Sequence, residues 1–467
     1  MRKTKIICTL GPASERTETL RKMIEAGADV FRLNMSHGTH EWVREIVPRI
    51  RALARKAGRP LAILLDTQGP AIRTGDLKTE FHLKPGDILE FTVRDARSKE
   101  RFSVDVNYSG FADDVSVGNT IIVDNGLLKL LVLDKGKNRV RCKVLTHAVL
   151  GSRRHINLPG VRVNLPPLTK KDMADVALGV ELGVDFVGLS FVREKSDIEE
   201  LRQLLVKKKS KAQIVAKIED QLAVRAIDTI IEAADVIMVA RGDLGIECPM
   251  EELPIIQRRI VKSCIRFGKP VVIATQLLES MIINPSPSRA EITDVANAVF
   301  EQADAVMLSG ETTVGRYPVE CVEVLHRVAL RIERSGGAGY AADALLGNVR
   351  QKTVGSAVVL ANSLRDSKLI VFTLHGTMAR YVSNLRPERA PIFAFTPSLE
   401  VCRQLSMLWG THPIQITFTD DPDRTIRLAE KFLRQNKLIV PGNHLIVISD
   451  MRMGQALIDC IQLRVAK

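Results

Sequence analysis

The chain has 467 residues and a formal net charge of +13, because 67 lysines and arginines outnumber 54 aspartates and glutamates. Hydrophobic residues make up 45% and charged residues 26% of the sequence, which excludes a disordered chain, and the length predicts two or three domains. No apolar run approaches the roughly 18 residues of a membrane helix, and no signal-type region follows Met1. Seven cysteines without a C-x-x-C pair are typical of reduced side chains. We therefore expect a soluble, cytoplasmic protein that has no membrane partner.

Residues 1–70 and 166–344 alternate short apolar runs with helical patterns. Runs that are apolar almost throughout indicate parallel strands buried on both faces; they are Thr4–Leu10, Asp29–Met35, Leu61–Thr67, Asp185–Phe191, Gln213–Glu219, Val236–Ala240, Pro270–Gln276 and Ala305–Ser309. Helix-length segments lie between them at Arg16–Ala26, His40–Ala57, Lys195–Lys208, Glu251–Phe267 and Arg289–Phe300. About eight β-then-α units predict an α/β fold, a TIM (β/α)8 barrel, as the catalytic domain.

Two further segments have a different pattern. Residues 71–165 contain short alternating stretches and turn signals, which predict a small β domain, an inserted β-barrel lid on the active-site face of the larger barrel. The glycine-rich segment at 334–345 reads as a linker. Residues 345–467 alternate again and predict a separate C-terminal open α/β domain.

The excess positive charge is unevenly distributed among these segments. The inserted segment has 16 basic and 11 acidic residues (+5), the C-terminal segment 16 and 9 (+7), and the predicted barrel 35 and 34 (+1). Aromatic residues are only 4% of the chain, and the densest basic run, Lys207–Lys211, ends a predicted helix where cations face water. Since nonspecific nucleic-acid binding favours a basic stripe with interleaved aromatics, we expect no nucleic-acid partner.

Polar residues interrupt the apolar runs at the carboxyl ends of six predicted strands. In a TIM barrel these ends meet at one face, where reactive groups cluster. Any one of them could be a satisfied structural pair, but six strands turning polar at the same end favour a site. The residues are Arg32, Asn34, Ser36, Asp66, Thr67, Lys217, Glu219, Arg241, Asp243, Thr275, Gln276, Ser309 and Glu311.

Glu219 and Asp243 are the most informative pair. Adjacent strands lie about 4.8 Å apart, so the two carboxylates could share one divalent ion, and oxygen ligands suit Mg²⁺ or Mn²⁺. Lys217 lies two residues from Glu219 and would add positive charge on the same face; the alternative interpretation is a plain Lys217–Glu219 salt bridge. Glycines at Gly242 and Gly245 let backbone N–H groups approach an anionic substrate. The set favours phosphoryl or enolate chemistry over acyl transfer.

At these residues the chain closely resembles the pyruvate kinase family. The resemblance covers nearly the whole predicted barrel, in family order. Its motifs are Thr4-Lys-Ile-Ile-Cys-Thr-Leu-Gly-Pro-Ala-Ser, Phe31-Arg-Leu-Asn-Met-Ser-His-Gly, Asp66-Thr-Gln-Gly-Pro-Ala-Ile-Arg-Thr-Gly, Asn157-Leu-Pro-Gly-Val, Ala216-Lys-Ile-Glu, Met238-Val-Ala-Arg-Gly-Asp-Leu-Gly, Ala274-Thr-Gln-Leu-Leu-Glu-Ser-Met-Ile, Arg289-Ala-Glu-Ile-Thr-Asp-Val-Ala-Asn-Ala-Val and Met307-Leu-Ser-Gly-Glu-Thr.

The resemblance implies transfer of a phosphoryl group from phosphoenolpyruvate to ADP, giving pyruvate and ATP. Glu219 and Asp243 would hold Mg²⁺ or Mn²⁺, Lys217 would stabilise the phosphoryl group and the enolate, and Gly242 with Thr275 would bind the carboxylate. Thr275, through a water relay with Ser309, would lie near the protonated carbon. Arg32 and Arg73 would meet phosphates, with Asn34 and His37 on the nucleotide side. The family's potassium ligands match Asn34, Ser36, Asp66 and Thr67. The family also implies a homotetramer.

Several positions depart from the family pattern. Ala71 stands where potassium-dependent members carry glutamate and potassium-independent ones usually lysine, so the pattern leaves potassium dependence open. Arg154 replaces a lysine that approaches the nucleotide. The loop Thr373–Thr377 allows two interpretations, a site for a phosphorylated allosteric effector or a plain turn into the next helix. A catalytically silent homologue would require a broken site, whereas Lys217, Glu219, Asp243, Arg32 and Thr275 are all present.

Overall fold

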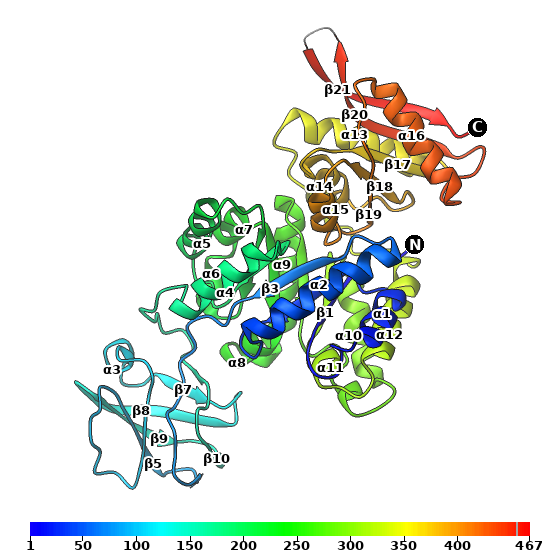
Figure 1. The fold of residues 1–467 in the computed structure, drawn as a ribbon. Coiled ribbons are helices and arrows are strands. Elements are labelled where there is room, and N and C mark those ends of the chain that lie inside the picture. Colours follow the sequence, from blue (N-terminus) through cyan, green and yellow to red (C-terminus); the bar gives the residue numbers. More distant parts are fainter. Residues whose placement is uncertain (454–455) are drawn as a thin grey trace.

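The predicted TIM barrel is confirmed by a computed structural model, which describes residues 1–453 and 456–467. Eight parallel strands close in the order β1-β2-β3-β12-β13-β14-β15-β16. The barrel lies at the centre of the molecule, between the inserted segment and the C-terminal domain (Figure 1). The strands are β1 (Lys5–Thr9), β2 (Val30–Asn34), β3 (Ala62–Asp66), β12 (Phe186–Leu189), β13 (Gln213–Ile218), β14 (Val236–Ala240), β15 (Val271–Ala274) and β16 (Ala305–Leu308).

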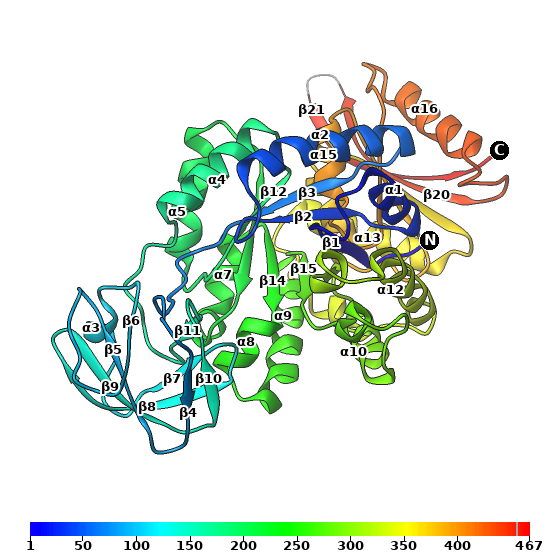
Figure 2. The ribbon, with the colours of Figure 1, turned by 60° about the horizontal axis from the view of Figure 1, so that its bottom comes forward.

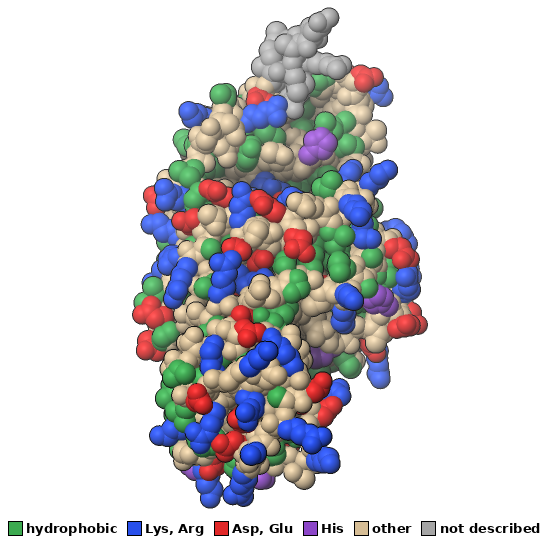
Figure 3. Space-filling view, turned by 90° about the vertical axis from the view of Figure 1, so that its left-hand side faces the viewer, with side chains coloured by type: hydrophobic (Ala, Val, Ile, Leu, Met, Phe, Trp, Pro, Cys, Tyr) green, Lys and Arg blue, Asp and Glu red, His purple; other side chains and the backbone are tan. Residues whose placement is uncertain are grey.

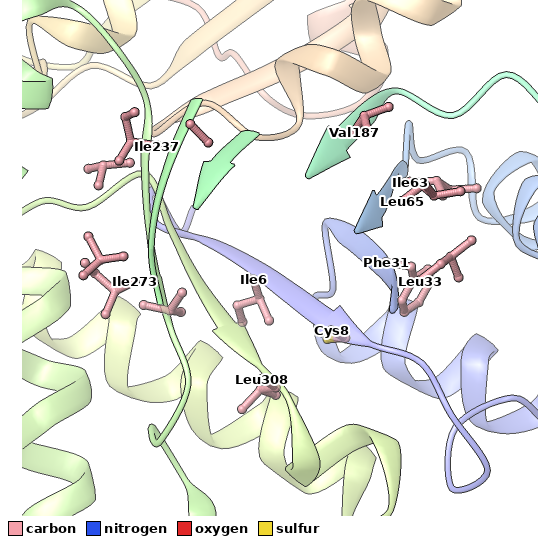
Figure 4. Packing of buried hydrophobic residues seen from close by; sticks show 14 of the residues in the cluster. Ile6, Cys8, Phe31, Leu33, Ile63, Leu65, Val187, Ile237, Ile273 and Leu308 are labelled. Atoms are coloured by element: carbon pink, nitrogen blue, oxygen red, sulfur yellow. The ribbon is translucent and has the colours of Figure 1, made fainter. Parts of the chain in front are cut away.

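Helices surround this barrel because alternate side chains of each strand point outward. Ile6 and Cys8 belong to the hydrophobic layer beneath the helices, whereas Ile7 belongs to the barrel interior. Figure 4 shows the outward-facing set. The helices are α1 (Thr17–Ala26), α2 (His40–Ala57), α4 (Lys170–Glu181), α5 (Lys195–Lys207), α6 (Gln221–Arg225), α7 (Ile227–Ala233), α8 (Arg241–Glu247), α9 (Leu253–Phe267), α10 (Arg289–Phe300), α11 (Gly310–Thr313) and α12 (Pro318–Glu333), with short 3-10 turns at η1 (Met250–Glu252), η2 (Glu279–Ile282) and η3 (Tyr340–Asp343).

The inserted segment follows β3 and forms two sheets around its own hydrophobic core. We expected a small barrel; the sheets are instead open, with orders β11-β7-β8-β9-β5-β6 and β10-β4, because β4 and β10 pair only with each other. The β5–β6 pair is parallel. The elements are β4 (Phe81–Leu83), β5 (Ile88–Thr92), β6 (Phe102–Asp105), α3 (Phe111–Asp114), β7 (Thr120–Val123), β8 (Leu128–Gly136), β9 (Arg139–Val144), β10 (Ala148–Leu150) and β11 (Ile156–Asn157).

The C-terminal domain is the expected open α/β sheet, in the order β19-β18-β17-β20-β21. Four strands are parallel, and β21 pairs antiparallel with β20 at the edge. Its elements are α13 (Val349–Ser363), β17 (Ser367–Phe372), α14 (Thr377–Asn384), β18 (Ile392–Thr396), α15 (Leu399–Leu405), β19 (Thr411–Gln415), α16 (Pro422–Gln435), β20 (His444–Met453) and β21 (Ala456–Val465).

Buried contacts attach the C-terminal domain to the end of the barrel opposite the strands' carboxyl ends. Met407, just after α15, packs in the barrel's interior cluster. Arg386 donates from Nη2 to Asp304 Oδ2 over 2.6 Å, and both side chains are at most 2% exposed. Arg403 Nε lies 2.6 Å from Asp185 Oδ1. Because Asp304 and Asp185 directly precede β16 and β12, the contacts fix the domain to the strand starts.

The described surface carries charges of both signs (Figure 3), and the cysteines are unpaired. On the described residues of the face in Figure 3, Lys and Arg side chains are interspersed with Asp and Glu. All seven cysteines are free, and six are buried. Across residues 1–453 and 456–467, no helix has the length and apolar character needed to cross a membrane.

The Arg386–Asp304 pair generates a stability prediction. We expect Arg386→Ala to lower the free energy of unfolding by about 3 kcal/mol or more, because it leaves the Asp304 carboxylate buried without its cation. Chemical denaturation of the full chain measures this loss. Arg21→Ala is the matched control, since Arg21 pairs with Glu18 on an exposed helix face, and its unfolding midpoint should stay close to wild type. Equal midpoints for both variants would contradict the prediction.

Candidate active site

One lysine side chain links the groups at the mouth of the barrel. Lys217, on β13, is 8% exposed. Its Nζ lies 2.8 Å from Glu219 Oε1 and 3.5 Å from Asp66 Oδ2, and it donates a 2.8 Å hydrogen bond to Ser190 Oγ. Burial opposes the charged ammonium, but Asp66 and Glu219 outweigh it and raise the Lys217 pKa. The residue is therefore a fixed positive charge inside the site.

Arg32 and Asp66 extend this cluster onto β2 and β3. Arg32 Nε donates over 2.6 Å to Asp66 Oδ2, and Nη1 donates over 3.1 Å to Thr9 Oγ1. Burial disfavours the Asp66 carboxylate, yet Lys217 and Arg32 together hold its pKa below the ordinary value. The β2–β3 register, which places Asn34 opposite Asp66, brings these strand ends together. Asp66 is thus ionised, while its Oδ1 is buried with no hydrogen-bond partner in the described part of the chain.

Glu219 is the carboxylate that this cluster leaves least compensated. Its Oε2 accepts a 2.6 Å hydrogen bond from the Phe191 backbone N–H, and its side chain is 2% exposed. Burial, to which the charge of Asp243 adds, raises the Glu219 pKa to about 7 in spite of Lys217. Additional positive charge nearby would lower this raised pKa and stabilise the charged form of Glu219.

The donor set fits a divalent cation completed by substrate. Three carboxyl groups, Asp66, Glu219 and Asp243, face two cations, Lys217 and Arg32, so the five side chains carry one net negative charge when all of them are ionised. Among the described residues, no group of three or more His, Cys, Asp or Glu side chains forms a metal cage. Two carboxylates with open positions suit Mg²⁺ or Mn²⁺, which keep waters and accept substrate oxygens. Glu219 and Asp243 are therefore suitable metal ligands.

Helix α8 and strand β15 place Gly242 against Thr275. The Gly242 N–H donates over 2.8 Å to Thr275 Oγ1. Thr275 and Gln276 have positive φ angles of 69° and 55°, a conformation that costs free energy for residues with a Cβ. Arg241 stabilises this backbone conformation, because its Nη2 donates to the Thr275 and Gln276 carbonyls over 2.7 and 3.3 Å. The backbone is strained where the substrate carboxylate is expected.

Ser309 lies at the end of β16 without a direct bond to Thr275. Its backbone N–H donates over 2.7 Å to Glu311 Oε2, and Glu311 Oε1 accepts from the Leu278 N–H over 3.1 Å. The Ser309 Oγ is buried, and the described residues offer it no hydrogen-bond partner. An unpaired buried hydroxyl at the mouth of the barrel is compatible with the predicted water relay.

The four residues matched to potassium lie at the ends of β2 and β3. Asn34 Oδ1 accepts from the Ser36 N–H over 3.1 Å, and Thr67 is buried with its Oγ1 donating to Gly188 O over 2.9 Å. Gly188 leaves room for Asp66, since a Cβ there would lie 2.6 Å from Asp66 Oδ1. Among the described residues, this Oδ1 has no hydrogen-bond partner.

The residues expected on the nucleotide side form no hydrogen-bonded cluster with Lys217 in the described chain. His37 is exposed on the turn after β2. Arg73 Nη1 donates to the Arg153 carbonyl over 3.1 Å, and Arg154 Nη1 lies 3.5 Å from Asp124 Oδ1. Both arginines belong to the inserted segment, so their distance from the barrel residues depends on where that segment sits.

Two residues were missed by the strand-end argument. Ser190 joins Lys217 to the Thr67 carbonyl, to which its Oγ donates over 2.7 Å. Phe191, with a φ of 53°, presents its N–H to Glu219. Ser190 and Phe191 end the fourth predicted strand, so the same strand-end rule would have found them.

Comparison with known proteins identifies the family. The family model "Pyruvate kinase, barrel domain" matches residues 1–322, and "Pyruvate kinase, alpha/beta domain" matches residues 351–462. A pyruvate kinase of Geobacillus stearothermophilus is 41% identical over 97% of this chain and 78% of its own length. Plastidial pyruvate kinase 3 of Arabidopsis thaliana is 41% identical over 96% of this chain and 78% of its own.

A solved structure agrees with these relatives. The crystal structure of a pyruvate kinase from Cryptosporidium parvum superposes with a TM-score of 0.95 at 34% identity, covering 100% of this chain and 96% of that one. The likeness therefore extends over the barrel, the inserted segment and the C-terminal domain together. The chain belongs to the pyruvate kinase family of phosphotransferases.

Proposed function

We propose that the chain transfers the phosphoryl group of phosphoenolpyruvate to ADP, giving pyruvate and ATP. The observation that carries this proposal is the buried Lys217 between Asp66 and Glu219, at the mouth of a barrel that matches the family model. Phosphoryl transfer depends mostly on positioning and charge neutralisation. The buried ammonium of Lys217 has a fixed position and a positive charge, and the carboxylates beside it would hold a cation that adds further positive charge.

Lys217 and Arg32 would stabilise the negative charge that spreads over the phosphoryl oxygens during transfer. Their positions are held by ion pairs with Asp66 that leave little freedom to reorganise. Mg²⁺ or Mn²⁺, held by Glu219 and Asp243, would act as a Lewis acid toward substrate oxygens. The ammonium of Lys217 would also stabilise the enolate oxygen that remains after the phosphoryl group has been transferred.

Thr275 and Ser309 would serve the second half of the reaction. The Thr275 hydroxyl accepts from Gly242 and is held by the Arg241-bound turn, so its oxygen has a fixed position. The unpaired Ser309 Oγ supports a water between the two side chains, which would deliver a proton to the enolate carbon. On the nucleotide side we assign Asn34, His37, Arg73 and Arg154.

The domain roles follow the same proposal. Residues 1–70 and 166–344 would form the catalytic domain, 71–165 the lid that excludes water during transfer, and 345–467 the regulatory domain. A cavity of about 410 Å³ in the C-terminal domain includes the loop Thr373–Thr377 and the side chain of Arg350, which supports a site for a phosphorylated effector. Membership of the family is what supports assembly into a homotetramer. We place the protein in the cytoplasm.

Replacement of Lys217 tests the catalytic assignment. We expect Lys217→Met to lower kcat for pyruvate production from phosphoenolpyruvate and ADP by about 1,000-fold, because the transition-state charge loses its nearest fixed cation. A coupled assay with Mg²⁺ measures the rate. Lys207→Met is the matched control, since Lys207 is exposed at the end of α5, and it should keep full activity. Near wild-type transfer by Lys217→Met would disprove the assignment, and inactivity of the wild type would disprove the proposed function.

Ala71 makes the potassium requirement testable. Ala71 supplies no positive charge, and Asp66 Oδ1 has no hydrogen-bond partner in the described residues. We therefore expect K⁺ to supply the missing charge and to raise wild-type activity several-fold. Ala71→Lys should largely remove this stimulation, because its ammonium supplies the missing charge. Rates are compared in KCl and in tetramethylammonium chloride of equal ionic strength. Equal wild-type rates in the two salts would rule out the potassium site.

A further inference from the structure

The last strand of the lid contacts the barrel beside the metal-binding carboxylates. Strand β11 is held within the lid by pairing with β7, in which Asn157 lies opposite Ile122. The His155 ring, one residue before β11, lies 5.8 Å from the Phe191 ring. Because the Phe191 N–H donates to Glu219, a shift of β11 would change the position of Glu219, a proposed metal ligand.

A second contact joins β11 to helix α8. Asn157 Nδ2 donates a 3.1 Å hydrogen bond to Glu247 Oε1, and the two residues are only 6% and 7% exposed. Glu247 is the last residue of α8, the helix whose first turn contains Gly242 and Asp243. Figure 2 shows β11 beside this helix. One hydrogen bond thus ties the lid to the helix that presents the substrate and metal groups.

This pair is poorly suited to a purely stabilising role. The Asn157 Oδ1 is buried with no hydrogen-bond partner in the described residues, which costs free energy that an apolar side chain would avoid. Burial raises the pKa of Glu247 to about 7, and the hydrogen bond from Asn157 only partly opposes this. Buried polar groups retained at such a cost are typical of functional positions.

The pair lies beside a cavity between lid and barrel, whose walls include Asn157, Glu247, Phe191 and Glu219. On the barrel side, the Gln221 side chain donates to the Glu247 backbone carbonyl. The backbone of Glu247 is therefore held by the barrel, and the hydrogen bond from Asn157 is made to an acceptor whose position does not depend on the lid.

We propose that Asn157 and Glu247 are positioning residues that fix the lid over the site during phosphoryl transfer. This inference rests on the proposed function. Neither residue touches the reacting atoms; the hydrogen bond sets the angle of β11 and with it the closure over the nucleotide. When closure is incomplete, water competes with ADP: its oxygen forms the new bond to phosphorus, the bond to the enol oxygen breaks, and the protonated enolate leaves as pyruvate with inorganic phosphate.

The test is a double-mutant cycle on the full chain with Asn157→Ala, Glu247→Ala and the double variant. We expect each single variant to lower kcat/KM for ADP about tenfold, because each loses the same buried hydrogen bond. The double variant should be no worse than either single one. The ratio of pyruvate to ATP should rise above the wild-type value of one, since water now takes part of the phosphoryl groups.

Conservative and control variants separate positioning from loss of stability. Glu247→Gln should recover most of the activity, because its Oε1 still accepts from Asn157 Nδ2. Asn138→Ala, in the turn between β8 and β9, and Glu252→Ala, exposed before α9, should behave as wild type. Multiplicative losses in the double variant, or a pyruvate-to-ATP ratio of one in all variants of an active enzyme, would overturn this inference alone. An inactive wild type would instead overturn the proposed function.

Discussion

The mouth of the barrel holds more negative charge than its own side chains neutralise, and the site is organised around that imbalance. Lys217 and Arg32 keep Asp66 ionised, but burial, to which the charge of Asp243 adds, raises the pKa of Glu219. A divalent cation would reverse the sign of the local balance, and an anionic substrate would then complete it. The proposed binding of metal and substrate and the fixed position of Lys217 all rest on this one electrostatic constraint.

The fold maintains this constraint from both ends of the barrel. Asp185 and Asp304 at the starts of β12 and β16 bind arginines of the C-terminal domain, while Ser190 and Ser309 follow the other ends of those strands. Met407 fills the closed end of the interior. At the open end, β11 of the lid contacts Phe191 and α8. The barrel strands thus connect the C-terminal domain, the charged groups at the mouth of the barrel and the inserted segment.

The sequence was sufficient for the parts of the site that follow from strand periodicity. Lys217 and Glu219, two residues apart on an apolar strand, were predicted to share a face, and they do. Ser190 could have been named from its place at the end of the fourth predicted strand, but its contacts with Lys217 and Thr67 depend on how the strands pair, which periodicity does not contain. The Asn157–Glu247 hydrogen bond joins residues 90 positions apart in two domains, so a local sequence pattern could not predict it. The open sheet of the lid could not be predicted in this way either, because it depends on which strands pair.

Metal binding to the intact chain tests the electrostatic account most directly. Mn²⁺ binding in the presence of phosphoenolpyruvate can be measured by electron paramagnetic resonance for the wild type, Glu219→Gln, Asp243→Asn and the exposed control Glu18→Gln. The account predicts one Mn²⁺ per chain for the wild type and Glu18→Gln, and affinity at least about tenfold weaker when either carboxylate at the mouth is neutralised. Unchanged stoichiometry and affinity in Glu219→Gln and Asp243→Asn would contradict it.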